Sequence, residues 1–430
     1  MEVRFLGGAG EVGRSALLVD DSLLLDFGML TETPPQFPVE TPTPDAVVVS
    51  HGHLDHVGTL PALLSGTERP PIHWTPPTRE LALTLARDTL KLHGGTLQCP
   101  FTETDVQRMT QVSETHGYRD PFEAAGYEIT FYNAGHIPGS AHVLIDDGDT
   151  RLLYTGDFHT GNSQGADAAS GRTNGGVSPV NGQRLVSETT ARPDADAVIC
   201  ESTYSDAEHE NRSVVEERFT ESVETTLWEG GTVVVPAFAI GRTQEMLLIC
   251  EAHDIPCYVD GMGKEVTRML LRHPEFVRDA DALRRAKSHA RFVTGRDGQR
   301  KRITDQKAAI ITTSGMLSGG PAMTYIPEIR SNPMNKITMT GYQVKGTPGR
   351  DLLDTGSAEI DGRIMPVSAR VEQYDFSAHA DRDGLLGFLD EYRDVPVLIN
   401  HGDRCDAFAE ELQGDGIEAH APDLDATVDL

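Results

Sequence analysis

The chain has 430 residues, of which 66 are acidic and 37 basic, for a formal net charge of −29 at pH 7. This length predicts two or three domains, or one domain that carries a large insertion. The absence of a long apolar run, of a basic leader and of paired C-x-x-C cysteines argues against a membrane-spanning helix, a signal peptide and a disulfide framework, so we expect a protein of the reducing cytoplasm.

Short strands and turns dominate the first third of the chain. Apolar runs bounded by Gly and Asp predict strands over 3–6, 16–19, 23–26, 45–50, 128–133 and 151–155, and a helix is predicted over 78–92 behind two prolines. Residues 161–184 form a low-complexity stretch rich in Gly, Ser and Asn, which predicts a surface loop.

From about Ser205 the pattern changes to strands that alternate with helices. Helices are predicted over 214–228, 242–252 and 264–272, and strands over 232–236, 256–260, 308–312 and 336–340. This alternation is typical of a parallel α/β sheet. After Met365 short motifs return, with a helix over 382–392, a strand over 395–400 and a last short strand. We therefore expect residues 1–204 and 366–430 to form one domain, with 205–365 inserted into it.

A glycine-rich segment near the start resembles a nucleotide-binding motif. Residues 8–13 match G-x-G-x-x-G and follow a predicted strand. A dinucleotide site needs this turn to open a helix, but the segment that follows reads as a strand. We expect a tight β-turn here, and no nucleotide cofactor.

The segment HGHLDH is the strongest functional signal in the chain. His51, His53, Asp55 and His56 lie within six residues, directly after a buried strand. Imidazole and carboxylate groups are the ligands that Zn²⁺ and similar ions prefer. The two histidines of H-x-H can reach one ion, and Asp55 and His56 can reach a second.

Six residues cannot complete two tetrahedral sites, so further ligands must come from elsewhere. Four candidates each leave an apolar run beside glycine, where a loop turns over the edge of a sheet; they are Asp26, His136, Asp157 and His401. Each alone is more often a cap or turn residue. His142 is a rival ligand, but it follows a tight turn at Gly139 and Ser140.

These motifs resemble a known family. Asp26, HGHLDH, His136 and Asp157 resemble the four signature motifs of the metallo-β-lactamase superfamily. The remainder resembles its β-CASP nucleases, in ESTY (201–204), PAFAIGRTQE (236–245), TSGMLSGGP (313–321), GYQVKGT (341–347), DFSAHAD (375–381) and His401-Gly. The order of the motifs is similar to that of archaeal homologues of the endonuclease subunit of the cleavage and polyadenylation specificity factor, of the short type without KH domains. The resemblance implies an α/β fold, an αββα sandwich with an inserted Rossmann-like parallel β-CASP domain.

The resemblance also implies a site and a reaction. Two Zn²⁺ per chain would be held, one by His51, His53, His136 and Asp157, the other by Asp55, His56, Asp157 and His401. Asp26 would orient a bridging water, and His379, positioned by Glu201, would be the general acid. A hydroxide activated by both metals would attack an RNA phosphodiester and leave 5′-phosphate and 3′-hydroxyl ends.

Eight residues in the family motifs are candidate contacts to single-stranded RNA. They are Ser202, Thr203, Tyr204, Arg242, Ser314, Gly315, Lys345 and Ser377. The alternative for each is a helix cap or a surface charge. The resemblance further suggests a homodimer and a role in processing mRNA 3′ ends.

The acidic composition does not exclude an RNA substrate. Only seven of the 37 basic residues are Lys, and aromatic residues make up 6% of the chain. Few lysines and many carboxylates favour adaptation to high salt, where charge repulsion is screened within about 3 Å. The alternative is a protein that simply repels nucleic acids.

Four functions remain in competition. An RNA endonuclease is favoured, and a 5′-to-3′ exonuclease of the RNase J type is close to it. A metal-free RNA-binding scaffold would require missing ligands, and none is missing. A hydrolase of small molecules would need neither the long insertion nor His379.

Overall fold

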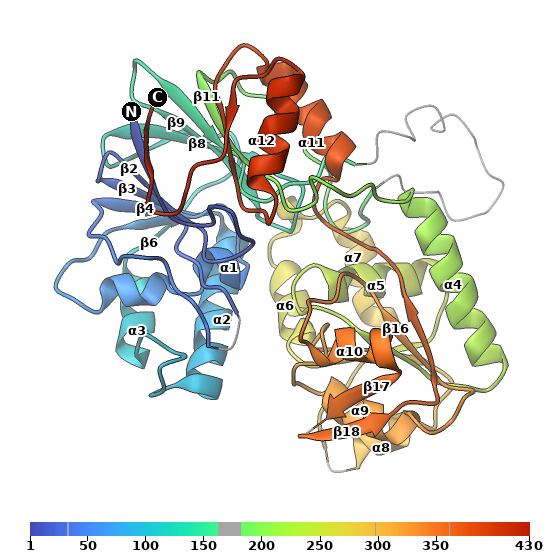
Figure 1. Cartoon of the computed structure of the whole chain (residues 1–430). Coiled ribbons are helices and arrows are strands. Elements are labelled where there is room, and N and C mark those ends of the chain that lie inside the picture. Colours follow the sequence, from blue (N-terminus) through green and yellow to red (C-terminus); the bar gives the residue numbers. More distant parts are fainter. Residues whose placement is uncertain (32–33, 162–181, 297, 361) are drawn as a thin grey trace. The chain divides into compact units, whose positions relative to one another are not determined.

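A computed structural model describes residues 1–31, 34–161, 182–296, 298–360 and 362–430. Most of the predicted low-complexity loop, at 162–181, lies outside the described residues. The chain divides into two compact units (Figure 1). The first comprises Met1–Gly161, Glu188–Glu208 and Ala378–Leu430, and the second Asn162–Ser187 and His209–Ser377.

The first unit contains two sheets of seven strands each. One sheet has the order β22 (Thr427–Asp429), β1 (Glu2–Gly7), β2 (Ala16–Val19), β3 (Leu23–Leu25), β4 (Ala46–Val48), β5 (Ile72–Trp74) and β6 (Ser113–Thr115). The other has the order β21 (Ala419–His420), β20 (Val397–Asn400), β11 (Ala197–Glu201), β10 (Arg151–Tyr154), β9 (Ala141–Asp146), β8 (Tyr127–Asn133) and β7 (Phe122–Ala124).

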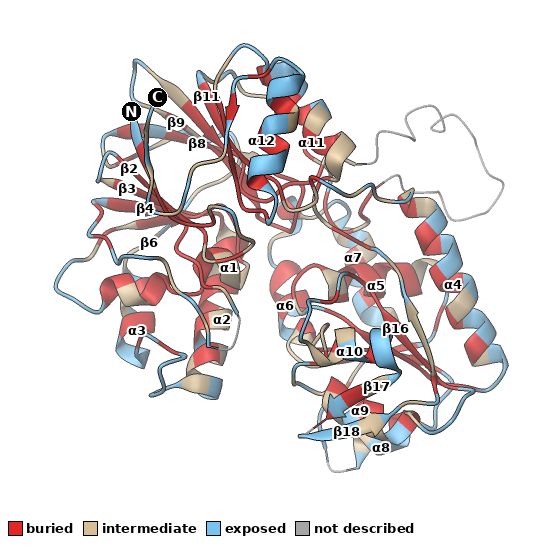
Figure 2. Cartoon of the chain, viewed as in Figure 1, coloured by how far each residue is buried: buried red, intermediate tan, exposed pale blue. Residues whose placement is uncertain are grey.

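The alternation of side chains along these strands builds two apolar faces per sheet. On β2, Leu17 and Val19 join the core cluster that also contains Ile129 and Val143 of the second sheet, whereas Leu18 joins a cluster with helical residues. Successive side chains of a strand point to opposite faces, so a strand apolar throughout must be covered on both sides. Figure 2 shows the central strands of both sheets buried along most of their length.

Helices cover the outer face of each sheet. Helices α1 (Leu54–Val57), α2 (Pro76–His93) and α3 (Glu103–Gln111) belong to the first sheet's side, and α11 (Arg382–Leu389) and α12 (Cys405–Gly414) to the second's. Leu83 and Met109 pack with Trp74 on one side, and Phe388 and Phe408 pack with Val198 on the other. The layers are therefore αββα, which confirms the predicted fold class.

The second unit is built on one parallel sheet of six strands. Its order is β14 (Arg291–Phe292), β13 (Cys257–Asp260), β15 (Ala309–Thr312), β12 (Val233–Pro236), β16 (Lys336–Met339) and β19 (Arg370–Gln373). Its helices are α4 (Arg212–Trp228), α5 (Arg242–Ala252), α6 (Gly263–Leu270), α7 (Ala280–His289), α8 (Gln299–Ile303), α9 (Ala322–Ile329) and α10 (Pro348–Thr355). A hairpin of β17 (Ser357–Ile360) and β18 (Arg363–Pro366) follows α10. This is the Rossmann-like alternation that the sequence predicts.

One boundary differs from the expected one. Strand β19 pairs in parallel with β16, with Lys336 opposite Arg370. Residues up to Ser377 therefore group with the second unit, whereas the sequence-based boundary lies at 365. The glycine-rich segment at 8–13 connects β1 to the antiparallel β2, so it is a turn and opens no helix. Among the described residues, no helix is both long and apolar enough to cross a membrane.

Candidate metal centre

The predicted ligand residues follow strands of the first unit. His51, His53 and Asp55 come after β4, and His136, Asp157 and His401 come after β8, β10 and β20. Strands β10, β11 and β20 are parallel neighbours, and β8 runs in the same direction as β10 because β9 is antiparallel to both. The carboxyl ends of these strands therefore meet at one edge of the sheet, where residues distant in sequence converge.

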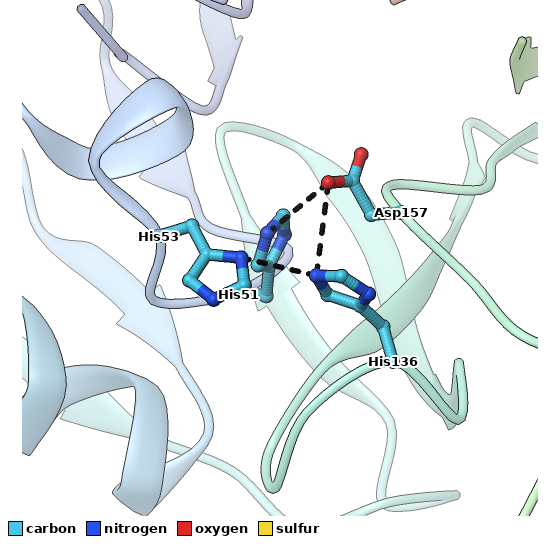
Figure 3. A group of neighbouring side chains, drawn as sticks. All are labelled: His51, His53, His136 and Asp157. Carbon is cyan, nitrogen blue, oxygen red and sulfur yellow. Dashed lines mark hydrogen bonds and ion pairs between the residues drawn. The ribbon is translucent and has the colours of Figure 1, made fainter. Parts of the chain in front are cut away.

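The first group of ligands is His51, His53, His136 and Asp157, whose candidate ligand atoms all lie within 4.8 Å of one another (Figure 3). His53 Nδ1 lies 3.0 Å from His136 Nε2. Asp157 Oδ2 lies 3.4 Å from His51 Nε2 and 3.8 Å from His136 Nε2. Three imidazoles and one carboxylate thus face a common point.

The second group is Asp55, His56, Asp157 and His401. Asp157 Oδ1 lies 3.3 Å from His56 Nε2 and 3.6 Å from His401 Nε2. His401 Nε2 lies 3.7 Å from Asp55 Oδ2. Asp157 is common to both groups and offers a different oxygen to each, as a bridging ligand would.

The polar atoms at the centre lack the hydrogen bonds that burial normally demands. His51 Nε2, His56 Nε2, both ring nitrogens of His401 and Asp157 Oδ1 are buried and have no hydrogen-bond partner among the described residues. Buried polar groups without partners are costly and rare in native proteins. The donor set of imidazoles and carboxylates suits Zn²⁺ and similar divalent ions. The residues present therefore fit a pair of divalent metals.

The protonation states also suit metal binding. Burial, reinforced by neighbouring imidazoles, holds the pKa of His51 and of His136 well below the ordinary histidine value. Burial lowers the pKa of His53 to about 4. For Asp157, burial opposes ionisation, but His401, His56 and His51 outweigh it and hold the pKa well below the usual range. Metal ligands must be deprotonated, and these four residues are at neutral pH. His56 is the exception: burial lowers its pKa, but Asp157 and Asp26 outweigh burial and hold the pKa well above the ordinary histidine value, so this ring must lose a proton to bind a metal.

The contacts of Asp26 favour a different role from the one predicted. Asp26 Oδ2 lies 2.7 Å from His56 Nδ1 and accepts hydrogen bonds from Ser50 Oγ at 2.7 Å and Tyr154 Oη at 2.8 Å. Its Oδ1 accepts from the Ser50 backbone N–H at 2.7 Å. Asp26 is fully buried, and both of its carboxylate oxygens contact protein groups. It therefore fixes the orientation of the His56 ring, in which Nε2 points toward Asp157, and does not orient a water.

His379 lies beside the centre with a carboxylate partner of its own. Its Nδ1 is 3.1 Å from both carboxylate oxygens of Glu201, and its Nε2 is 4.0 Å from Asp157 Oδ2. Glu201 is held by the backbone N–H of Phe158 at 2.9 Å. Burial lowers the pKa of His379, but Glu201 and then Asp157 outweigh burial and raise the pKa to about 9. His379 is therefore protonated at neutral pH, as a proton donor must be.

Of the three predicted RNA contacts in the first unit, Ser202 and Thr203 have hydroxyls that form hydrogen bonds within the protein. Ser202 is buried, and its hydroxyl donates to Asn400 O at 3.2 Å and lies 3.4 Å from Cys405 Sγ. Its predicted role as an RNA contact is therefore disfavoured, because the hydroxyl is turned into the protein. Thr203 donates to His401 O at 3.2 Å, and the ring of Tyr204 lies 5.7 Å from that of His379. Tyr204 remains the better placed candidate.

The other predicted RNA contacts lie in the second unit, mostly after its strands. Ser314 and Gly315 follow β15, and the hydroxyl of Ser314 has no hydrogen-bond partner among the described residues. Arg242 begins α5 and donates to Thr340 O. Lys345 is exposed, and Ser377 is buried at the end of the unit.

Two other histidine clusters have protein partners. His142, the rival ligand, is buried between Thr155 O at 2.8 Å and Thr189 Oγ1 at 3.0 Å, outside both ligand groups. His73 and His116, beside Glu114 at β5 and β6, are paired at 3.0 Å and stack on Phe122.

Some supporting residues were not predicted from the sequence. Ser50 and Tyr154 hold Asp26, and the carbonyl of Ala378 lies 2.9 Å from His136 Nδ1. Ser50 directly precedes His51, so a polar residue at the end of an apolar strand was a usable signal. The position of the Ala378 carbonyl depends on tertiary packing and has no signal in the sequence.

Comparison with known proteins assigns the family. Residues 9–202 match the model of the metallo-beta-lactamase superfamily, 243–352 that of the Beta-Casp domain, and 364–422 that of the Zn-dependent metallo-hydrolase RNA specificity domain. The chain is 33% identical to RNase aCSPSF2 of Saccharolobus solfataricus, over 100% of this chain and 85% of that protein. It is 31% identical to the probable RNase MJ4 of Methanocaldococcus jannaschii, over 95% and 94% of the two chains.

Two further proteins are similar over most of the chain. Transcription termination factor FttA of Pyrococcus horikoshii is 32% identical, over 99% of this chain and 70% of that protein. A solved structure of a protein of unknown function from Enterococcus faecalis shares the fold, with a TM-score of 0.60, 12% identity and 99% of each chain covered. From the shared domains and the full-length relatives, we conclude that the chain belongs to the β-CASP family of the metallo-β-lactamase superfamily.

Proposed function

We propose that the chain is a zinc-dependent ribonuclease that hydrolyses RNA phosphodiester bonds to 5′-phosphate and 3′-hydroxyl ends. One observation carries the proposal: two groups of ligands share Asp157, and an independently held His379 lies 4.0 Å from that shared carboxylate. RNA is supported as the substrate because two of the relatives bear the word RNase in their names.

The ligand residues have a defined task in this reaction. His51, His53 and His136 would hold one Zn²⁺ and Asp55, His56 and His401 the other, with Asp157 shared. When bound, the pair would act as a Lewis acid and lower the pKa of water to about 7. Asp26 keeps His56 in one tautomer, with Nδ1 on the carboxylate and Nε2 toward the centre.

His379 would supply the proton that the departing 3′ oxygen needs. Glu201 holds Nδ1, and Nε2 lies 4.0 Å from Asp157 Oδ2, so its proton would be directed toward a substrate bound at the centre. An alkoxide is a poor leaving group, and a positioned acid contributes about 10²–10⁴-fold. Without Glu201 the ring would lose the partner of Nδ1, and its pKa would fall because the largest of the charges that oppose burial would be gone.

The proposal favours internal cleavage over the two main alternatives. The motif details resemble the cleavage-factor group more than RNase J, and endonucleases need no free end. A non-catalytic scaffold is disfavoured because the seven candidate ligand residues lie together in two groups that could each hold a metal. A role in processing mRNA 3′ ends belongs to the same proposal.

Circular RNA tests the proposal. The pure protein should cut a circular single-stranded RNA, and the linear product should carry a 5′ phosphate that a phosphate-dependent exonuclease can use. Survival of the circle while a linear 5′-monophosphate RNA is degraded to mononucleotides would assign the exonuclease mode. Survival of both would refute ribonuclease activity.

Two further properties belong to this proposal. The chain is expected to form a homodimer, which light scattering of the pure protein would test. The charge of −29 suggests adaptation to salt, so fold and turnover should be retained or improved in about molar KCl, where repulsion is screened. Loss of helicity on adding KCl, or best activity at low salt, would contradict the second expectation.

A further inference from the structure

One segment of the second unit has a positive net charge, whereas the rest of the chain is strongly negative. Residues 278–307 carry four acidic and ten basic residues, Arg278, Arg284, Arg285, Lys287, Arg291, Arg296, Arg300, Lys301, Arg302 and Lys307. This segment has a net charge of +6, against −29 for the whole chain, so the other residues carry −35. Seven of the ten cations are arginines.

The cations lie on three consecutive elements at one edge of a sheet. Strand β14 is the outermost strand of the parallel sheet, with α7 directly before it and α8 after it. Arg284 and Lys287 are three residues apart on α7, so their exposed side chains lie on one side of that helix. Arg291 is exposed on β14 itself, and Arg296 and Arg302 are exposed after β14 in the sequence, in the following loop and on α8.

Part of this charge is compensated and part is not. Arg300 pairs with buried Asp260 at 2.7 Å, and Arg285 pairs with Glu251 at 2.9 Å. In contrast, the exposed Lys287, Arg296 and Arg302 form no ion pair within the described part of the chain. We define these three and the exposed Arg291 as the β14-edge surface.

We infer that the β14-edge surface binds the phosphate backbone of single-stranded RNA, as a second contact site on the unit that does not hold the metal centre. The choice of RNA as the polyanion rests on the proposed function. Guanidinium groups bind phosphate oxygens with two parallel hydrogen bonds, so arginine contacts keep directional strength where salt screens simple charge attraction.

A purely structural role does not account for this surface. Charged side chains on an edge strand, lysine above all, prevent pairing with other chains, but Lys287, Arg296 and Arg302 lie outside β14 and do not serve that purpose. The remainder of the chain uses carboxylates for its exposed charge, since it carries −35. Cations retained without partners at one edge therefore indicate a ligand of opposite charge.

The test reverses the charge of the three unpaired cations. Lys287→Glu, Arg296→Glu and Arg302→Glu are combined, and the control combines Arg87→Glu, Lys91→Glu and Arg119→Glu, three exposed cations of the first unit. Both sets change net charge equally. Fluorescence anisotropy over a KCl series measures the affinity for a labelled RNA of roughly 30 nucleotides. This RNA is long enough to occupy more than one single-strand binding site of ordinary length. All proteins carry His379→Ala, so that metals are kept and cutting is slow.

The edge variant should bind the RNA at least about tenfold more weakly than its parent, and its salt slope should fall by about 2, at about 0.7 per lost phosphate contact. The control should change neither quantity by as much. Without His379→Ala, turnover of bis(p-nitrophenyl) phosphate should be unchanged in the edge variant, because the metal centre is intact. Lys287→Gln, Arg296→Gln and Arg302→Gln, a milder set, should show a smaller effect in the same direction if the reversed set folds poorly.

Equal losses in the edge and control variants would overturn the inference, because they would reflect net charge alone. Unchanged RNA affinity with lost binding of poly-glutamate would assign the surface to an acidic protein and also overturn it. The result is separable from the proposed function: a parent that binds RNA through this edge but never cuts it would refute the ribonuclease and keep the surface.

Discussion

Two of the clusters of buried charged and polar side chains in the described part of the chain differ in how their atoms are matched. The cluster in the second unit consists of Arg184, Arg212, Glu216, Glu245 and His253. Glu216 accepts from Arg184 Nε at 2.8 Å and His253 Nε2 at 2.9 Å. Glu245 accepts from Arg212 at 2.7 Å and from the backbone N–H groups of Arg184 and Leu185, each at 2.9 Å.

In the metal centre the atoms face one another without such bonds. Asp157 Oδ1 and the Nε2 atoms of His51, His56 and His401 have no hydrogen-bond partner among the described residues. In the second-unit network the two carboxylates are satisfied by their own neighbours, although Arg212 Nε has no partner among the described residues, so Glu216 and Glu245 need no cation from outside. A ring of acceptors is satisfied only by a cation. The comparison teaches that burial alone does not mark a functional site, whereas unmatched acceptors do.

The largest expected effect comes from the shared carboxylate. Asp157→Ala should lower the metal content at both sites and reduce RNA cleavage by about 10⁴-fold, since Lewis-acid stabilisation is worth several kcal/mol. Elemental analysis and initial rates would measure both quantities. Full metal occupancy in this variant would contradict the bridging role.

Next in size is the general acid. His379→Ala should keep its metals and its RNA affinity, while turnover falls by about 10²–10⁴-fold. A substrate whose scissile 3′ oxygen is replaced by sulfur needs no proton, so parent and variant should cut it at nearly equal rates. If the sulfur substrate is slowed as much as ordinary RNA, His379 does not protonate the leaving group.

A smaller effect is expected from the residue that fixes His56. Asp26→Asn keeps the size of the side chain but removes the negative charge beside His56 Nδ1. Replacing a residue that hydrogen-bonds to a metal ligand typically lowers metal affinity by about 10–100-fold. Competition with a chelator would measure that affinity, with Asp20→Asn, on the exposed face of the same unit, as control. Equal affinities in both variants would mean that Asp26 does not tune the centre.

The matched network should affect stability and not chemistry. Glu216→Gln leaves Arg184 and His253 without their buried counter-charge, so the second unit should lose about 3–5 kcal/mol of unfolding free energy. Turnover per folded molecule should stay within about twofold, because none of the network residues belongs to the metal centre. The activation barrier should therefore change by much less than the roughly 1.36 kcal/mol that corresponds to a tenfold change in rate. If Glu216→Gln lost turnover but kept its stability, the claim that this network is structural and not catalytic would be wrong.

The same network predicts that the folding stability of the second unit falls at acid pH. Burial raises the pKa of Glu216, but His253 and Arg184 outweigh it and lower the pKa to about 2, from the ordinary value of 4.5. The folded state therefore binds the proton less readily than the unfolded one. Its contribution to stability is fully present above pH 4.5 and is lost as the pH falls toward 2. Glu216→Gln should flatten the decline in thermal stability within that window, and an unchanged decline would assign it to other groups.

The sequence predicted the site better than it predicted what supports the site. The residues from His51 to His56 follow a buried strand, and Asp157 and His401 each leave an apolar run, so local patterns together with the family resemblance singled them out as candidate ligands. The partners of Asp26 and the inward turn of Ser202 depend on which strands become neighbours, which no local pattern contains. Helices α7 and α12 were not predicted, and β19 joined the inserted sheet through a pairing distant in sequence.

Metal reconstitution tests the central claim most directly. The protein is stripped with a chelator, Zn²⁺ is returned in fractions of an equivalent, and cleavage of a circular RNA is followed with the metal content measured at each point. The account predicts no cleavage without metal and a rise that ends at two equivalents per chain, because Asp157 joins two groups of ligands. Cleavage by the stripped protein, or a plateau at one equivalent, would contradict it.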